Sequence, residues 1–228
     1  MAEHRLEVLD DAEAVHRRGA EIIAEAIKTD LSERGHCALA VSGGRDPWPM
    51  FSRLEEFELD WREIEIFQVD ERVAPAGSPE RNLTHLVESL SIGAQGSIRP
   101  MPVTDDNLEA AADRYAASLP DALDLAHLGL GPDGHTASLV PGDSVLEVTD
   151  KRVAVTSGEY QGVRRMTLTY PELHRTRRLL WVVTGEDKVD ALRKLVDQDP
   201  STPSGRVEPG GDSLILADRA AAPGGAGR

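Results

Sequence analysis

Hydrophobic residues follow two patterns along the chain: one is the helical spacing, and the other is the short, mostly apolar run that is typical of buried strands. Over residues 10–34 they fall at helical spacing, which predicts a helix that ends near Gly35. These apolar positions are Ala14, Val15, Ile22, Ile23, Ala26, Ile27 and Leu31. The run at 37–41 follows and is apolar at every position, which predicts a short parallel strand that is buried on both faces.

The same two patterns alternate through the rest of the chain. They predict strands near 64–69, 97–103, 123–128, 152–156, 165–169, 179–183 and 213–217, and helices near 81–90, 105–119 and 186–197. Prolines in the segment 97–103 favour an edge position for that strand. Alternating strands and helices predict an α/β fold, with a mostly parallel sheet and helices on both faces. No repeat or linker divides the sequence, so we expect one domain over residues 1–219 and a disordered small-residue tail at 220–228.

Composition narrows the range of functions. The 228 residues carry a formal net charge of −15, so we expect no nucleic-acid and no membrane partner, because both bind clustered lysines and arginines. A small anionic substrate is compatible with this charge if the few basic side chains converge in one cleft. Cys37 is the only cysteine, which excludes an internal disulfide and a thiolate metal site. No apolar run follows the N-terminus and none approaches the length of a membrane span, which predicts a cytoplasmic location.

The glycine-rich loop at residues 129–134 is the segment that points most directly to chemistry. A half-buried strand precedes it, and residues 136–140 resume an apolar pattern that predicts the start of a short helix. Asp133 and His135 are therefore expected on a loop at the carboxyl end of a strand, where open α/β sheets collect their ligands. A carboxylate two residues from an imidazole at this place indicates an oriented acid–base group. The alternative is that Asp133 caps the helix and that His135 is a surface residue.

A second glycine loop, Ser42-Gly43-Gly44, directly follows the first predicted strand and precedes a helix start. Small residues at such a turn let backbone N–H groups approach a phosphate, and Arg45 adds positive charge. Many strand–helix turns contain two glycines without binding an anion. Asp46 is followed by proline, which is typical of a helix N-cap. Its carboxylate would occupy the same N–H groups and repel a dianion, which counts against tight phosphate binding.

Further charged side chains are predicted at the same edge of the sheet. The segment Asp70-Glu71-Arg72 closes a strand, and Arg72 would offer two-pronged recognition of an oxyanion; the alternative is a surface ion pair. Arg165 opens another strand, and Lys188 is expected in the first turn of a helix. The helix dipole disfavours a cation there, which indicates a functional role, and a solvated surface lysine is the alternative. No histidine or carboxylate cluster has metal-ligand spacing, so we predict no metal and no cofactor.

Taken together, these stretches resemble the 6-phosphogluconolactonase family, within the broader group that includes glucosamine-6-phosphate deaminases. The matching pieces appear in the family's order and span roughly residues 38 to 217. They are Ala40–Gly44, Gln68–Val73, Arg81-Asn82, Leu128–Leu139, Arg165–Thr169 and Gly185-x-x-Lys188. The run Gly-Pro-Asp-Gly-His-Thr-Ala-Ser is long and specific. The resemblance implies a Rossmann-like fold, no required metal, and hydrolysis of 6-phospho-D-glucono-1,5-lactone to 6-phospho-D-gluconate in the oxidative pentose phosphate pathway.

The resemblance also implies a role for each candidate residue. His135 would be the general base that activates water, and Asp133 and Asp70 would line the site and orient the imidazole or the water. Cationic side chains and the glycine loop would bind the phosphate or the developing oxyanion, namely Ser42, Gly43, Gly44, Arg45, Arg72, Arg165 and Lys188. One base worth about 10²–10⁴-fold, together with positioning, suits an activated ester such as a lactone. The expected partner is the phosphorylated sugar lactone, bound by a monomer or a homodimer.

One residue departs from the family's pattern. The family's glycine loop usually continues with threonine before proline, whereas this chain has Asp46. We expect weakened phosphate affinity or lost activity, which makes a non-catalytic sugar-phosphate-binding homologue one alternative function. A sugar-phosphate deaminase or isomerase is the other. The deaminases follow their Asp-Gly-His with Ile-Ala-Phe-Asn-Glu, and residues 136–140 of this chain lack that glutamate.

Overall fold

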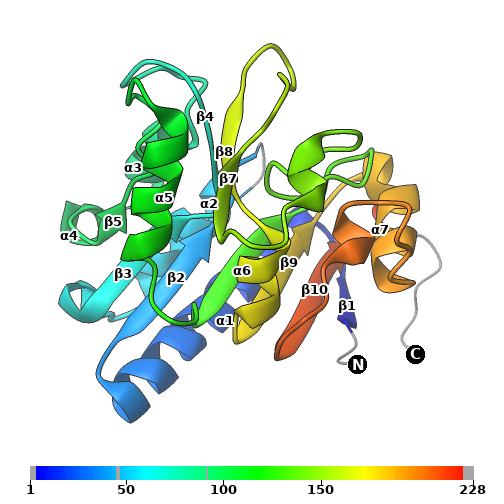
Figure 1. Ribbon diagram of the computed structural model, residues 1–228. Coiled ribbons are helices and arrows are strands. Elements are labelled where there is room, and N and C mark those ends of the chain that lie inside the picture. Colours follow the sequence, from blue (N-terminus) through cyan, green and yellow to red (C-terminus); the bar gives the residue numbers. More distant parts are fainter. Residues whose placement is uncertain (1–3, 45–46, 91, 223–228) are drawn as a thin grey trace.

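A seven-stranded sheet forms the centre of the computed structural model, which describes residues 4–44, 47–90 and 92–222 (Figure 1). From one edge to the other, the strands are β1 (Arg5–Leu9), β10 (Asp212–Asp218), β9 (Arg178–Val183), β6 (Leu125–Gly129), β2 (Cys37–Val41), β3 (Ile64–Gln68) and β5 (Ile98–Arg99). Every pairing in this sheet is parallel. The predicted α/β fold with a mostly parallel sheet is therefore confirmed, and β5 lies at an edge as its prolines predict.

A second sheet has three antiparallel strands, in the order β4 (Asp70–Arg72), β8 (Arg165–Leu168) and β7 (Val153–Val155). The sequence pattern places residues 70–72 at the end of the strand before them, but they form a strand of their own. The pairing of β4 with β8 sets Arg72 opposite Arg165. The small sheet thus brings together two cationic residues that are far apart in the sequence.

Helices cover both faces of the large sheet. The long helix α1 (Ala12–Arg34) packs on one face, and α5 (Leu108–Ser118) and α6 (Tyr170–Arg175) pack on the other (Figure 1). Asp11 caps the start of α1 by accepting the N–H of Ala14, and Gly35 ends it with a φ of 74°. The shorter helices are α2 (Trp48–Ser52), α3 (Asn82–Ser89), α4 (Ile92–Gln95) and α7 (Val189–Val196), with 3-10 turns at Arg53–Glu56, Trp61–Glu63, Ser144–Glu147, Glu186–Lys188 and Ser204–Arg206.

The two faces of the sheet carry two hydrophobic cores because successive side chains of a strand point to opposite sides. On β2, Ala38 and Ala40 join one core, whereas Leu39 and Val41 join the core beneath α1. Burial on both faces explains why β2 is apolar at every position. Among the helices that the structure describes, none is both long enough and apolar enough to cross a bilayer.

Three segments differ from the sequence pattern. β1 is not predicted; its five residues are exposed or only partly buried at the sheet edge, and parallel pairing with β10 holds them in place. The helix start expected at 136–140 is wrong: Thr136 and Leu139 form a β-bridge around Ala137, whose φ is 52°. Of the expected tail, residues 220–222 are described, and Ala221 is buried in the core; residues 223–228 lie outside the described part of the chain.

Candidate active site

A cavity of about 510 Å³ opens at the carboxyl ends of the central strands. Its walls come from the segments that follow β2, β6 and β9, together with residues of β4, β8 and the hairpin between β7 and β8. Neighbouring parallel strands end at the same edge of a sheet, so loops distant in sequence meet there. Eight of the residues that the sequence singles out line this one cavity, namely Ser42, Gly43, Gly44, Asp70, Arg72, His135, Arg165 and Lys188.

The glycine loop after β6 folds back on itself and presents His135. The N–H of Gly131 donates to the carbonyl of His135 at 2.8 Å, which closes the loop. A Cβ on Gly131 would overlap the His135 ring, so the close approach of backbone and imidazole requires glycine at this position. The loop then continues through the tight turn at Ala137 instead of a helix, with Thr136 Oγ1 donating to the carbonyl of Gly129 at 2.9 Å.

Asp133 and His135 form a hydrogen-bonded pair. His135 Nδ1 lies 2.5 Å from Asp133 Oδ1, and the backbone N–H of His135 donates to the same oxygen at 3.1 Å. Burial by itself would raise the pKa of Asp133, but the charge of His135 and hydrogen bonds from His135 and Tyr160 outweigh it and lower that pKa. The His135 side chain is 20% exposed, so its ring is open to the cavity. Because no helix begins here, the alternative of Asp133 as a helix cap is excluded.

Asp70 lines the cavity, but its carboxylate is engaged in holding the site together. Ser138 Oγ donates to Asp70 Oδ2 at 2.7 Å, and Ser42 Oγ donates to Asp70 Oδ1 at 3.2 Å. Asn82 Nδ2 donates to the Asp70 backbone carbonyl at 3.0 Å. No hydrogen bond among the described residues joins Asp70 to His135. Asp70 therefore connects the loop after β2 with the segment that follows His135.

The alternative that residues 70–72 form a surface ion pair is wrong, because both acidic side chains are buried. The Glu71 carboxylate accepts the backbone N–H groups of Asn82 at 2.8 Å and Leu83 at 2.9 Å, which caps the start of α3. Arg72 donates through Nη1 to the Glu80 carbonyl at 2.8 Å and to Asn82 Oδ1 at 3.1 Å. These bonds fix the Arg72 guanidinium at the cavity wall.

Two further cations complete the wall. Arg165 is 4% exposed, and its Nη2 donates to Gln161 Oε1 at 3.0 Å. Burial lowers the pKa of Arg165, although the negative charge of Asp70 acts in the opposite direction. Lys188 is also mostly buried, at the end of the 3-10 turn that precedes α7, and its Nζ lies 3.1 Å from Asp187 Oδ2. A solvated surface lysine, the alternative for Lys188, is therefore excluded.

The loop after β2 is held close to the small sheet. A Cβ on Gly43 would overlap the side-chain amide of Asn82, which explains the glycine at this position. The Ser42 N–H donates to the His127 carbonyl at 3.2 Å, so this N–H is already engaged. The expected contributions of Arg45 and Asp46 lie outside the described residues. Helix α2 begins at Trp48, so the proline at 47 precedes the helix instead of opening it.

Sequence reasoning missed several residues of the cavity. Tyr160 and Gln161 line it from the hairpin between β7 and β8, and Asn82 and His85 line it from α3. His127 lines it from β6. Asn82 is quoted in the matching motifs without a role, and its position next to the predicted helix start is the signal that was available. The hairpin residues have no such signal, because their distance from residues 133–135 closes only in the folded chain.

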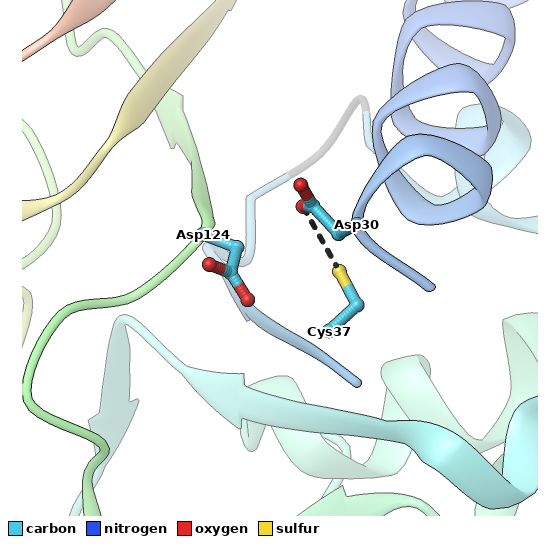
Figure 2. Close-up of side chains that lie close together, drawn as sticks. All are labelled: Asp30, Cys37 and Asp124. Carbon is cyan, nitrogen blue, oxygen red and sulfur yellow. Dashed lines mark hydrogen bonds between the residues drawn. The ribbon is translucent and has the colours of Figure 1, made fainter. Parts of the chain in front are cut away.

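A second cluster of potential ligand atoms lies at the opposite end of β2. Asp30, Cys37 and Asp124 face one another with their ligand atoms within 4.8 Å (Figure 2). Arg34 lies 2.7 Å from both carboxylates, and Arg178 binds Asp30 through two N–H groups at 2.8 and 3.0 Å. Burial, followed by the charges of the two aspartates, raises the pKa of the Cys37 thiol, which opposes the thiolate that a metal would need. The guanidinium groups already neutralise the carboxylates, so this donor set fits an internal ion-pair cluster and does not fit a metal site.

Comparisons with known proteins extend over nearly the whole chain. A 6-phosphogluconolactonase from a Nostoc species is 32% identical over 233 residues, which cover 95% of this chain and 96% of that protein. A 6-phosphogluconolactonase from a Synechocystis species is 31% identical over 234 residues, with the same coverage. The crystal structure of a 6-phosphogluconolactonase from Thermotoga maritima superposes with a TM-score of 0.85 at 27% identity, covering 95% of this chain and 100% of that chain.

The sequence model of one family covers most of the residues that build the cavity. It is described as glucosamine-6-phosphate isomerases/6-phosphogluconolactonase and matches residues 10–216. That range contains the glycine loop with His135, the paired strands with Arg72 and Arg165, and Lys188. The fold, the full-length relatives and this match agree, and the chain belongs to the glucosamine-6-phosphate isomerase/6-phosphogluconolactonase family.

Proposed function

We propose that this protein hydrolyses 6-phospho-D-glucono-1,5-lactone to 6-phospho-D-gluconate, a step of the oxidative pentose phosphate pathway. The observation that carries the proposal is an acid–base pair, Asp133 and His135, beside a cavity that three cationic side chains also line. The full-length relatives that bear the name 6-phosphogluconolactonase support the same reaction. A substrate that has both a carbonyl and a phosphate matches this cavity, because the acid–base pair can act on the carbonyl and the cationic side chains can bind the phosphate.

In this proposal His135 is the general base. The Nδ1–H of neutral His135 donates a hydrogen bond to the Asp133 carboxylate, and this tautomer has its free lone pair on Nε2. Nε2 accepts a proton from a water molecule while the water oxygen bonds to C1 of the lactone and the carbonyl electrons move to its oxygen. The tetrahedral oxyanion then re-forms the carbonyl, the bond between C1 and the ring oxygen breaks, and His135 returns the proton to that oxygen. The product acid ionises in water.

The cations of the cavity account for phosphate binding in the same proposal. Arg72 and Arg165 are neighbours across the pairing of β4 with β8, and guanidinium groups match the geometry of phosphate oxygens. Lys188 adds a third positive charge from the segment after β9. Such convergence lets a chain with a net charge of −15 attract a dianion at one place on its surface. A lactone held in this way presents its carbonyl to His135.

The experiment is a rate of lactone opening measured against the spontaneous background. Freshly prepared lactone is mixed with the purified protein in weakly buffered indicator solution, and proton release is followed. We expect a rate well above background, and a loss of about 10²-fold or more in His135→Ala. His36→Ala is the matched control, because that histidine is exposed and does not line the cavity. A wild-type rate equal to background would overturn the proposal.

The same preparation distinguishes the alternative functions. Release of ammonia from glucosamine 6-phosphate would identify a deaminase. Binding of 6-phosphogluconate without any turnover would identify a sugar-phosphate-binding homologue. We further propose a cytoplasmic enzyme that acts as a monomer or a homodimer; light scattering after size-exclusion chromatography distinguishes these two states.

A further inference from the structure

The tip of the hairpin between β7 and β8 has an unusual backbone. Tyr160 donates its N–H to the carbonyl of Val163 at 3.0 Å, and only Gln161 and Gly162 lie between them. Both intervening residues have positive φ, 56° and 83°, as in the tight turns that match the twist of a two-stranded hairpin. Glutamine rarely adopts a positive φ, so we infer that contacts of the surrounding residues stabilise this backbone conformation at Gln161.

The Tyr160 side chain reaches from this tip to the acid–base pair. Its hydroxyl donates to Asp133 Oδ2 at 3.1 Å and lies 3.3 Å from His135 Nδ1. The two rings meet at 62°, with their centroids 5.1 Å apart. Burial, followed by the negative charge of Asp133, raises the pKa of Tyr160, so the hydroxyl stays protonated and serves as a donor. The Asp133 carboxylate is thereby held at both oxygens, by Tyr160 on one and by His135 on the other.

The Tyr160 ring also contacts a cation of the cavity wall. The Arg165 guanidinium lies 5.0 Å from the centroid of the Tyr160 ring, within the range of a cation–π contact. Arg165 Nη2 also donates to Gln161 Oε1 at 3.0 Å and to the Tyr160 carbonyl at 3.4 Å. The charged groups that face Tyr160 are therefore Asp133, His135 and Arg165. One side chain joins the proton-transfer group to an anion-binding group.

We propose that Tyr160 is a positioning residue for lactone hydrolysis: its hydroxyl fixes the Asp133 carboxylate that orients His135, and its ring fixes Arg165 over the same cavity. This inference rests on the function proposed above. Asp133 is on a loop and its side chain is 37% exposed, so hydrogen bonds must restrict its rotation. A small displacement of a catalytic group can cost about 10²-fold in rate, which makes such restraint effective.

Two substitutions separate the two contacts. Tyr160→Phe removes the hydroxyl and keeps the ring over Arg165; we expect kcat to fall about 10-fold while KM changes less than twofold. Gln161→Ala removes the side-chain bond to Arg165 and leaves the hydroxyl in place; we expect KM to rise with kcat unchanged. Tyr170→Phe is the matched control, because it removes a buried tyrosine hydroxyl, bonded to the Pro203 carbonyl at 2.9 Å, that lies outside this cavity.

The pH profile supplies a readout that a merely structural role would not move. Without the Tyr160 hydroxyl, the Asp133 carboxylate interacts more strongly with the protonated imidazole. The acid limb of kcat/KM in Tyr160→Phe should therefore shift to higher pH. Wild-type kcat, KM and pH profile in Tyr160→Phe would overturn the proposal.

A measurement without substrate separates this inference from the proposed function. The ring nitrogens of His135 in the full-length protein are followed by ¹⁵N NMR during a pH titration. We expect the midpoint and the nitrogen shifts to differ between wild type and Tyr160→Phe, and to agree between wild type and Tyr170→Phe. Superimposable curves for wild type and Tyr160→Phe would overturn the positioning role even in an active lactonase. Altered curves in a protein that does not open the lactone would support the positioning of His135 and reject the proposed reaction.

Discussion

His127 should make the folded protein sensitive to acid. Its ring is 1% exposed on β6, in edge contact with Phe51 at a centroid distance of 5.2 Å. Burial, helped by nearby His16 and opposed by the Ser42 backbone, lowers the pKa of His127 to about 3. A histidine in the unfolded chain has a pKa of about 6.5. At a pH between these two pKa values, His127 is protonated in the unfolded chain and neutral in the folded protein.

The size of the effect follows from this difference in proton binding. The free energy of unfolding that depends on neutral His127 is fully present above pH 6.5 and is lost as the pH falls below that value. The loss approaches about 1.4 kcal/mol per pH unit, because the two states differ by one bound proton. From pH 7 to pH 5 it amounts to about 2 kcal/mol for a folded pKa near 3. This is a large fraction of the stability of an ordinary domain.

Urea denaturation at the two pH values tests this reasoning. The wild type should lose about 2 kcal/mol more than His127→Leu, whose side chain has no proton to gain. The comparison uses the change with pH and not the stability at one pH, so a packing defect in the variant cancels. His36→Leu is the control, because its ring is exposed and its replacement should leave the pH dependence as in wild type. Parallel losses in wild type and His127→Leu would refute the argument.

Three further predictions concern the Asp133–His135 pair, the buried ion-pair cluster around Asp30 and the loop after β2. Asp133→Asn should lower kcat on the order of 10²-fold without changing the urea midpoint, because the amide cannot stabilise the imidazolium; an unchanged kcat would contradict the mechanism. Asp30→Asn should lower the free energy of unfolding by about 3 kcal/mol, since it leaves Arg178 without its two-pronged partner, whereas the exposed Asp190→Asn should cost below about 0.5 kcal/mol; equal losses would exclude a stabilising cluster. Asp46→Thr should lower KM for the phosphorylated lactone by removing a carboxylate that repels the dianion, and an unchanged KM would mean that Asp46 faces away from the phosphate.

The assignment of Asp70 shows where reasoning from sequence stops. The pattern predicts Asp70 at the end of a strand and therefore at the site; Asp70 does line the cavity, although it begins the separate strand β4. Its hydrogen bonds go to Ser42, Ser138 and Asn82, which come from three other segments of the chain. A carboxylate at a strand end predicts neither these partners nor the absence of a bond to His135 among the described residues. Proximity in sequence to a motif is thus a guide to location and a poor guide to role.

Local chemistry by itself determined most of the helices and central strands of this protein and the end of the sheet at which its site lies. Asp11 and Gly35 bound α1, the apolar run of β2 requires burial on both faces, and the glycines after β6 require a tight loop. These are short-range effects of backbone conformation and hydrophobic period, so they can be read without knowing any distant contact. Only the tertiary structure decided that β4 pairs with β8 in a separate sheet, and that the hairpin between β7 and β8 brings Tyr160 onto the Asp133–His135 pair. The physical reason is that strand pairing and side-chain hydrogen bonds between distant segments depend on three-dimensional closure, for which the linear pattern of residues carries no local signal.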